Sequence, residues 1–384
     1  MDFNLNADQQ AFADSARALF ADFCSDEQLR AHDSGSEPFM RALWPQCIAN
    51  GLHGVLIGEA QGGLGLGMTE LLAVLQEQGR ALALVPLWEH QLAAASVQRF
   101  APALADAVAE AAEGRTLLTL SLDALSAARG ASLRATPAGA TWRIDGVAPA
   151  VPLGAQAQEA LLPVQVGGAL RLVLLDLALP GIQCIEGRTQ HHLAVADLRL
   201  QGVTVTAESL LDEAALAWVE PRAVACLAAL QLGVSTQQLL RTVQYVSERK
   251  QFGRVVGSFQ LVAGQMADGH IACEALRSAL AQLVYRIDAG RGCQAQALAV
   301  KVLAADAGHL VGHKAQHVHG GIGVDLSYPI HRFLYWSRAL GITLGGSEPA
   351  LQQLGDWLAD HDTLGWKYDL PDDLAAEPGA KHAV

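Results

Sequence analysis

Charged residues are scarce in this 384-residue sequence: they make up 17% of it, whereas hydrophobic residues make up 51%. Positive charge is the scarcer sign, because 26 Lys and Arg stand against 39 Asp and Glu and leave a formal net charge of −13. So little charge argues against wholesale disorder, since the chain can bury a large core. The negative excess argues against nucleic acid and anionic membranes as partners. An anionic ligand such as a nucleotide would need a local cationic site.

Long apolar runs and paired cysteines are also missing. No run reaches the ~18 residues of a membrane span, and the best candidate, 223–234, contains Gln231. The N-terminal MDFNLNADQQ has neither a basic start nor an apolar stretch, so we expect no signal peptide and a cytoplasmic protein. The six cysteines form no CxxC pair, so we expect neither a metal nor a disulfide framework, and buried free thiols instead.

The hydrophobic pattern changes twice along the chain, which predicts an α+β protein. Asn6 is suited to cap a helix whose apolar face carries Phe12, Ala16, Leu19 and Phe23. From about Thr116, short apolar stretches alternate with turn residues, which is typical of antiparallel strands. Beyond Ala214 three long segments read as helices, with Pro221 at the first position of one of them. We therefore predict a helical domain at 1–115, a middle antiparallel β domain at 116–213, a four-helix-type bundle at 214–365 and an acidic tail at 366–384.

Two segments of the predicted bundle carry residues suited to a dinucleotide. The first is YVSERKQFG (245–253), followed by SFQ (258–260), and the second is QHVHGGIG (316–323), followed by YPIHR (328–332). An Arg at a helix end offers a planar fork to a pyrophosphate, and adjacent glycines leave backbone amides open to phosphate. Taken alone, Arg249 could equally be a surface ion pair and Gly320-Gly321 a plain turn.

Together with the loop GEAQGGLGLG (58–67), these segments resemble the signatures of the acyl-CoA dehydrogenase family, in family order and over nearly the whole chain. The resemblance implies that FAD lies between two subunits. One chain holds the isoalloxazine and supplies a Glu base, while its neighbour binds the ADP half. It also implies an acyl-CoA substrate and an acceptor similar to electron-transfer flavoprotein. The cofactor-binding residues that it implies are Arg249, Phe252, Val256, Phe259, Gln260, His317, Gly320 and Gly321.

The positions of the family's catalytic base are changed in this sequence. The Glu that usually follows the glycine loop falls on Leu344, and the alternative Glu at the start of the long helix falls on Ala223. A leucine or an alanine cannot take the α-proton of a thioester. Glu220 lies near the second position, and a shifted register around Pro221 would make it a fallback base. Its plainer interpretation is an acidic residue at a helix N-terminus.

The middle domain departs from the family as well. The family's TEPxxGSD segment aligns with 120–127 and its KxWIT segment with 148–152, so Leu120 and Ala150 stand where Thr and Trp would face the flavin. The motifs that would bind the ADP half of a neighbouring chain's FAD contain one departure from the family. His317 occupies the usual Gln position, and Gln316 is adjacent to it. The residues that would face the chain's own flavin are thus changed, whereas the motifs that would bind the ADP half of a neighbour's FAD are largely kept. This one-sided loss favours a chain that completes its partner's FAD site.

Three functions therefore remain open. The main prediction is the non-catalytic subunit of a heteromeric acyl-CoA dehydrogenase, paired with a homologous catalytic subunit. Family members of this kind often act on bulky acyl groups such as steroid side chains. The alternatives are a self-sufficient homo-oligomer that uses Glu220, and a non-enzymatic module that binds acyl-CoA or protein. One FAD per two chains, one per chain, or none would distinguish them.

Overall fold

The computed structural model describes residues 4–123 and 132–361. The predicted acidic tail at 366–384, and Ser126 and Ala127 of the segment aligned with the flavin contacts, lie outside these residues. Up to residue 112 the described chain is helical. Its helices are α1 (Ala7–Phe23), α2 (Asp26–Asp33), α3 (Trp44–Ala49), α4 (Met68–Ala81), α5 (Leu87–Phe100) and α6 (Ala105–Ala112), with short 3-10 turns at η1 (Glu59–Gln61) and η2 (Pro102–Leu104).

The predicted cap and apolar face of α1 are confirmed. The Asn6 side chain accepts a hydrogen bond from the backbone N–H of Gln9, and the Gln9 side chain accepts one from the N–H of Asn6, at 2.9 Å each. This reciprocal pair satisfies two N–H groups that the first turn leaves without helical partners. Of the predicted face, Ala16 is fully buried, while Phe12, Leu19 and Phe23 are half-buried and pack against the helical core. The fully buried Phe20 lies on the same side and was not predicted.

A seven-stranded sheet follows, in the order β1-β4-β2-β3-β7-β6, with β5 paired to β4. Four of the six pairings within the sheet are antiparallel, but β4 runs parallel to β1 and β2, so the sheet is mixed where an antiparallel one was predicted. Along β5, Leu172 and Leu174 join the core shared with the helices while Val173 and Leu175 join a separate core, as the two-residue period of a strand requires. The strands are β1 (Leu118–Leu120), β2 (Leu133–Ala138), β3 (Thr141–Pro152), β4 (Glu159–Val166), β5 (Ala169–Asp176), β6 (Ile182–Arg188) and β7 (Ala194–Thr206).

The rest of the described chain is the predicted helical bundle. After the turn η3 (Ala207–Ser209) come α8 (Ala214–Glu248), the hairpin β8 (Lys250–Gln251) and β9 (Arg254–Val255), the turn η4 (Val256–Ser258), α9 (Gln260–Asp288), α10 (Gln294–His319), η5 (Gly320–Val324), α11 (Ile330–Ile342), η6 (Thr343–Gly345) and α12 (Ser347–Asp360). Pro221 lies inside α8 and not at its first position, which corrects the predicted helix start. The Arg222 side chain donates to the Trp218 carbonyl at 2.9 Å, so this turn of the helix has a side-chain donor beside the proline.

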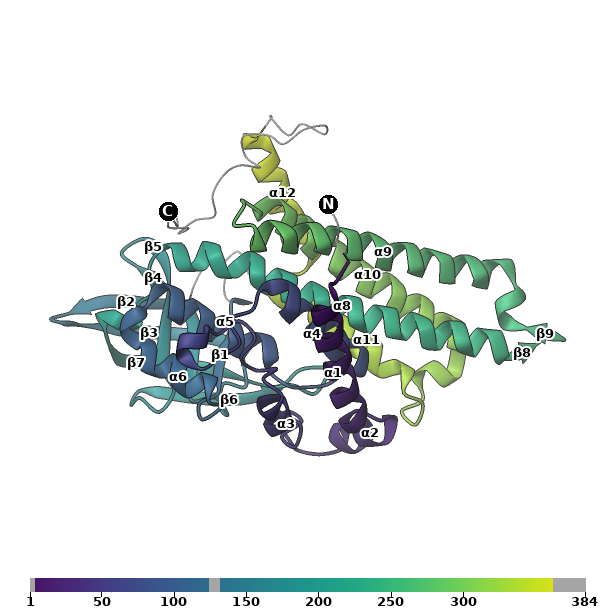
Figure 1. Ribbon diagram of the computed structural model, residues 1–384, viewed down its shortest axis with the longest axis horizontal. Helices are drawn as coiled ribbons and strands as arrows, with labels where there is room; N and C mark the ends of the chain where they lie inside the picture. The colour runs from purple at the N-terminus through teal and green to yellow at the C-terminus, as the bar shows by residue number, and fades with distance from the viewer. Residues whose placement is uncertain (1–3, 124–131, 362–384) are drawn as a thin grey trace.

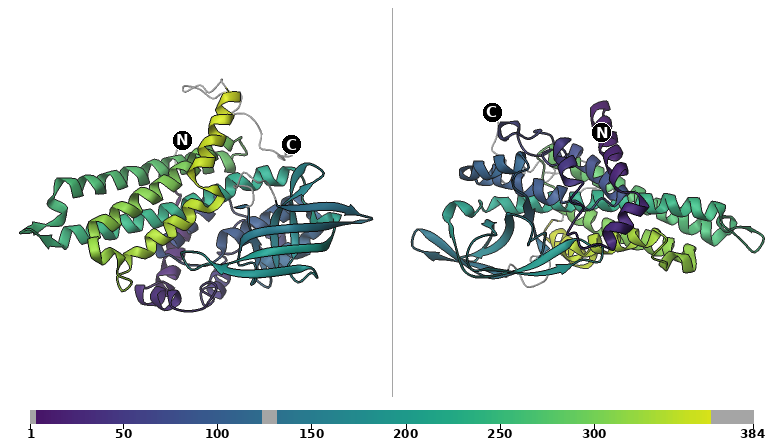
Figure 2. Two further views of the ribbon diagram at one scale, coloured as in Figure 1. Left: turned by 180° about the vertical axis from the view of Figure 1, so that it is seen from behind. Right: turned by 90° about the horizontal axis from the view of Figure 1, so that it is seen from below.

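The sheet and the free end of the bundle lie at opposite ends of the molecule (Figure 1). Helices α5 and α6 lie over one face of the sheet, and α8 runs from the sheet through the centre of the molecule to the β8–β9 hairpin (Figure 2). Among the described helices, α8 is long and apolar enough to cross a bilayer by length and composition, but 72% of its most apolar window is buried in the protein. It is therefore a core helix by its packing. All six cysteines lie in the described residues and none forms a disulfide; five are buried as expected, whereas Cys184 is exposed.

Candidate functional site

The motif segments of the bundle meet around three aromatic rings at its free end. Tyr245 of α8 stacks on His319 at the end of α10, with ring centroids 4.3 Å apart and planes 18° apart. The Tyr328 ring lies 5.5 Å from that of His319 and 6.3 Å from that of Tyr245. The structure thus brings together the segments 245–253, 316–323 and 328–332. Arg249 and the glycine pair are placed at one end of the molecule by this packing.

The β8–β9 hairpin presents the first of these segments to solvent. Phe252 and Gly253 are its two central residues and have φ values of 54° and 80°, the arrangement of a type I′ turn. The Phe252 side chain is 91% exposed. Its nearest aromatic neighbour is Phe259, whose ring lies 6.2 Å away edge-on and carries the Arg254 guanidinium on one face at 4.0 Å. A large aromatic held out on a short, well-formed hairpin is suited to contact another molecule.

Arg249 follows directly after α8 and is exposed. Its backbone is fixed, since its N–H donates to the Tyr245 carbonyl at 2.9 Å and its carbonyl accepts from Val256 at 2.7 Å. Within residues 4–123 and 132–361 its guanidinium has no ion-pair partner. The alternative that Arg249 forms an ordinary surface ion pair therefore does not hold within the described part of this chain. The guanidinium is therefore available to an anionic group.

The glycine pair at the end of α10 is also open. A Cβ built on Gly320 or Gly321 would meet nothing within 4 Å, and Gly320 has a φ of 62°. The neighbouring Gln316 has both side-chain polar atoms buried without a partner in the described chain. His317 is exposed and lies 3.2 Å from the Gln265 side chain on α9. Gln316 therefore faces inward at the glycine loop, while the predicted contact residue His317 faces outward.

The remaining predicted cofactor residues flank the hairpin. Val256 and Phe259 are half-buried at the turn into α9, whereas Gln260, the first residue of α9, is exposed. The predicted residues thus gather on one surface at the free end of the bundle. We call Arg249, Phe252, Gln260 and the Gly320-Gly321 pair the bundle-end surface.

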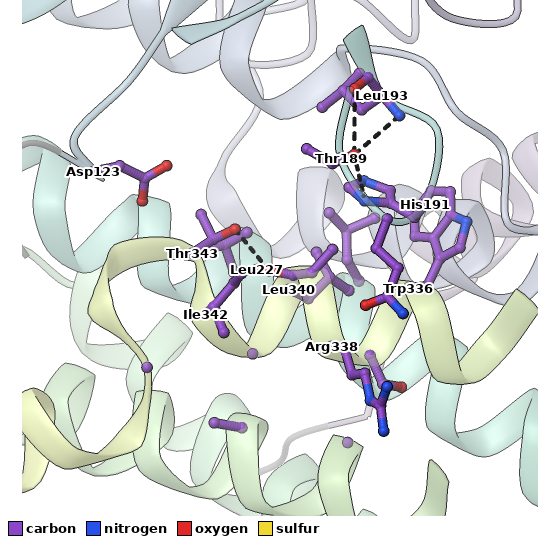
Figure 3. Close-up of a pocket in the computed structure, with 18 of the residues that line it drawn as sticks. Asp123, Thr189, His191, Leu193, Leu227, Trp336, Arg338, Leu340, Ile342 and Thr343 are labelled. Atoms are coloured by element: carbon purple, nitrogen blue, oxygen red, sulfur yellow. Dashed lines mark hydrogen bonds between the residues drawn. The ribbon is translucent and has the colours of Figure 1, made fainter. Parts of the chain in front are cut away.

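A second feature, a cavity of about 990 Å³, lies between the sheet and the helices. Figure 3 shows the loop Thr189–Leu193 on one side, α11 residues from Trp336 to Ile342 below it, and Asp123 at the opposite end. The loop is closed on itself, because the Thr189 hydroxyl lies 3.0 Å from His191 Nδ1 and accepts from the Leu193 N–H at 3.1 Å. Burial lowers the pKa of His191 to about 3, so its imidazole is neutral at physiological pH.

Two residues at the edge of this cavity have left-handed backbones. Ala150, which lines the cavity, has a φ of 48° and donates its N–H to Asp197 at 2.8 Å. Leu344, next to the lining residues Thr343 and Gly345, has a φ of 58° and donates its N–H to Asp123 at 2.7 Å. Such conformations are uncommon for residues other than glycine and gather at functional sites. Leu120, by contrast, is fully buried in the core and does not line the cavity.

The two alternative base positions lie elsewhere on α8. Ala223 is fully buried in the helical core. Glu220 is exposed at the surface of α8, although desolvation by the surrounding protein raises the pKa of its carboxyl to about 7. It is not among the residues that line the cavity. Since α8 begins at Ala214, Glu220 lies beyond the first turn, and the interpretation as an N-terminal helix charge does not hold.

Sequence reasoning missed the polar residues of the cavity. Gln78 of α4 and Glu89 of α5 line it and are 2% and 5% exposed. Burial raises the pKa of Glu89 to about 8, against opposing hydrogen bonds from its own backbone and from Trp88. The available signal was the polar triplet EHQ (89–91) between the apolar stretches VPLW and LAAA, because a charged residue is rarely buried without a reason.

Comparison with protein-family models finds two matches. The model "Acyl-CoA dehydrogenase, N-terminal domain" matches residues 6–107, and "Acyl-CoA dehydrogenase, C-terminal domain" matches residues 222–359. Among curated proteins, the chain is 32% identical over 372 residues to acyl-CoA dehydrogenase FadE27 of Mycobacterium tuberculosis, covering 94% of this chain and 99% of that protein. It is 28% identical to acyl-CoA dehydrogenase FadE28 of the same organism, covering 92% and 98%.

Two solved structures are similar over the whole chain. One is described as a variant of the Tcur3481-Tcur3483 steroid ACAD, with 35% identity, a TM-score of 0.87 and coverage of 92% of this chain and 98% of that one. The other is the crystal structure of the ChsE4-ChsE5 complex from Mycobacterium tuberculosis, with 31% identity, a TM-score of 0.89 and coverage of 94% and 99%.

Proposed function

This chain belongs to the acyl-CoA dehydrogenase family of FAD-dependent oxidoreductases, and we propose that within it the chain is the subunit that lacks a catalytic base and completes the FAD site of a partner subunit. The observation that carries the proposal is the pair of residues at the two base positions, Leu344 and Ala223. Neither side chain can accept a proton, and Ala223 is sealed in the core.

The reaction needs both a base and a flavin. A carboxylate must remove the α-proton of the thioester, and the chemistry that FAD would supply is acceptance of the hydride from the β-carbon. A positioned base typically contributes ~10²–10⁴-fold to the rate. A chain with Leu344 in that place is expected to bind and shape a site without completing the proton transfer.

The backbone around the cavity supports the view that catalytic side chains were lost while the backbone conformation was kept. Leu344 and Ala150 are held in left-handed conformations by carboxylates of Asp123 and Asp197, whatever side chains they carry. An alanine at position 150 supplies no aromatic ring at that position to cover a flavin. We infer that the scaffold of the chain's own flavin site persists while the groups that acted in it are absent.

The bundle-end surface supports the other half of the proposal. An exposed guanidinium on Arg249, an exposed ring on Phe252 and glycines with open space before them fit the pyrophosphate and adenine of an FAD. Figure 1 shows the hairpin at the end of the bundle farthest from the sheet. A cofactor that reaches it is therefore expected to have its isoalloxazine in another chain.

The relatives support the kind of partner and substrate. One similar structure is described as a steroid ACAD and another as a complex of two differently named proteins. We propose accordingly a homologous catalytic partner, a bulky acyl-CoA such as one derived from a steroid side chain, and an electron acceptor similar to electron-transfer flavoprotein. We place the assembly in the cytoplasm.

The decisive experiment measures FAD and activity with and without a partner chain. The chain alone should retain no stoichiometric FAD and should not oxidise acyl-CoA. Co-expressed with a homologous chain that carries the Glu, it should give about one FAD per two chains. Arg249→Ala should then weaken FAD binding about tenfold or more, because a charge-assisted hydrogen bond contributes about 1.5–3 kcal/mol and ~1.4 kcal/mol is a factor of ten.

The matched control is Arg134→Ala, which removes an exposed arginine from the sheet at the other end of the molecule. It should leave FAD binding unchanged, and both variants should melt at the wild-type temperature. If the Arg249 variant binds FAD as tightly as wild type, the cofactor does not reach the bundle-end surface. If the lone chain holds one FAD and turns over acyl-CoA, the proposal is wrong.

One observation favours a second candidate, a self-sufficient enzyme that uses Glu220. Desolvation raises the pKa of this carboxyl to about 7, close to the value that suits a general base at neutral pH. In that case the lone chain would be active and Glu220→Gln would abolish its activity. A lone chain that binds no FAD, even with candidate partners, would instead indicate the non-enzymatic binding module.

A further inference from the structure

Two histidines on α10 form a pair that the proposed function does not use. His309 and His313 are four residues apart, so they lie one turn apart on the same face of the helix. Their ring centroids are 4.3 Å apart and the ring planes are tilted by 46°. Both side chains are exposed, at the edge of the cavity that α10 contributes. A dissolved ion can therefore reach both rings.

The spacing of the pair suits the chelation of a metal ion. Histidines at positions i and i+4 of a helix can direct one nitrogen each to a common point, which is how helical zinc motifs use them. An ion held ~2.0–2.1 Å from one nitrogen of each ring would place the two ring centroids roughly 4.5–5 Å apart. The observed 4.3 Å lies close to this range, so small side-chain rotations suffice to close the site.

The ring nitrogens of the pair are available to an ion. In the described part of the chain, neither ring makes a hydrogen bond or an ion pair, and the contact that each makes is with the other ring. The pKa of His313 is lowered by desolvation, by His309 and by Arg338, so its imidazole is neutral at physiological pH, the form that binds metal. Three other histidines of the bundle have polar partners: His317, His319 and His331.

The charged groups near the pair favour a cation on balance. Asp306 lies one turn before His309 on the same face of α10, and Glu348 lines the cavity from the first turn of α12. The opposing charge is Arg338 of α11. Two carboxylates against one guanidinium, in a chain with a formal net charge of −13, attract a positive ion.

The protein supplies two ligands to such an ion. Among residues 4–123 and 132–361 no group of three or more His, Cys, Asp or Glu side chains could hold a metal ion. Water would therefore fill the remaining coordination positions. The scattered cysteines gave no reason to expect a metal framework, but a histidine pair one helical turn apart is a separate signal.

We propose that His309 and His313 together bind one divalent transition-metal ion, of the class of Zn²⁺, Ni²⁺ or Cu²⁺, at the α10 edge of the cavity. Imidazole nitrogens suit these ions, whereas Mg²⁺ and Ca²⁺ prefer oxygen ligands. The bound ion adds a positive charge to the cavity wall. The site shares no residue with the bundle-end surface and requires neither FAD nor a partner.

The test is a calorimetric titration of the full chain, without a histidine tag, with Zn²⁺ at pH 7.5 and with Mg²⁺ as the comparison. The wild type should bind Zn²⁺ and not Mg²⁺. His309→Ala and His313→Ala should each weaken Zn²⁺ binding about tenfold or more, because the second ring binds intramolecularly once the first holds the ion. Binding should be lost at pH 5.5, since the imidazoles then carry protons.

The matched control is His270→Ala, which removes a single exposed histidine from α9 and should leave Zn²⁺ binding unchanged. Alanine favours a helix, so all three variants should melt at the wild-type temperature in EDTA. Zn²⁺ should raise the melting temperature of the wild type and of the His270 variant, but not that of either pair variant. The electron paramagnetic resonance spectrum of the wild type with Cu²⁺ should show coupling to two nitrogen ligands.

Three results would overturn the proposal. They are a wild-type chain that does not bind Zn²⁺, a pair variant that binds it as tightly as the wild type, and a loss in the His270 variant as large as in the pair variants. None of these results would change the FAD stoichiometry with a partner chain, so the metal site and the proposed function stand or fall separately.

Discussion

Glu89 should make the stability of this protein fall as pH rises, and Glu89→Gln should remove that fall. The carboxyl is buried, and desolvation raises its pKa to about 8 from an ordinary value of 4.5. Below pH 4.5 it is protonated in both the folded and unfolded states. Between pH 4.5 and 8 the folded chain keeps the proton while the unfolded chain has lost it. Folding therefore takes up a proton, and the free energy of unfolding decreases through this window.

The size of the effect follows from the difference in pKa. Each unit corresponds to ~1.4 kcal/mol, so roughly 4 kcal/mol of stability should be lost between pH 5 and 8. The amide of Glu89→Gln is neutral at every pH and has nearly the same shape. The variant should therefore match the wild type at pH 5 and exceed it by roughly 4 kcal/mol at pH 8.

Guanidinium unfolding at pH 5, 6, 7 and 8 measures this difference directly, because all other titrating groups are shared by the two proteins. Glu208→Gln is the control, since Glu208 is exposed in η3 and its loss should not change the pH profile. A difference between the Glu89 variant and wild type that stays constant from pH 5 to 8 would refute the reasoning. It would mean that the Glu89 carboxyl is ionised or solvated in the folded chain.

Two further predictions concern packing. Asp33→Asn should lower the free energy of unfolding by about 3 kcal/mol, because it leaves the buried Arg332 without its carboxylate partner at 2.5 Å. Asp26→Asn breaks the half-exposed pair with Arg241 and should cost less than about 1 kcal/mol in the same melts. Gly233→Ala should be strongly destabilising, because the added Cβ would lie 2.0 Å from a main-chain oxygen of α4. In Gly264→Ala, in α9, the added Cβ meets nothing within 4 Å, so this variant should be neutral or more stable by up to about 1 kcal/mol. Equal melting temperatures within either pair would contradict the packing that the structure shows.

Much of the fold could be predicted because its signals are local. The cap at Asn6 and the apolar period after it depend on residues within a few positions of each other. The start of α8 was missed because proline usually marks a helix beginning. Here the helix continues through Pro221, with the Arg222 guanidinium bound to the Trp218 carbonyl and stacked 3.9 Å from its ring. This packing of Arg222 on Trp218 is visible only once the side chains are placed.

The cavity could not be predicted because no local signal marks it. Its lining includes residues of α4, α5, α8, α10, α11, the part of β3 around Ala150 and the loop around His191, which are far apart in the sequence. The mixed direction of the sheet was missed for a similar reason. The continuous apolar run at 160–164 is typical of a strand buried on both faces, but it does not show that β1 and β2 run parallel to β4.

The left-handed residues at the cavity edge explain how a chain of this fold could lose chemistry and keep its architecture. A non-glycine residue in this conformation costs roughly 1–2 kcal/mol, so something must hold it there. For Leu344 and Ala150 the holding groups are the side chains of Asp123 and Asp197, which bind the backbone N–H and are indifferent to the side chain at the held position. A substitution that exchanges a functional side chain at such a position therefore changes the chemical groups in the cavity and leaves the backbone hydrogen bond in place. Arg249 differs in this respect, because its guanidinium makes no ion pair within the described chain. If the proposed division of labour is right, Arg249 is retained for a ligand that another subunit brings.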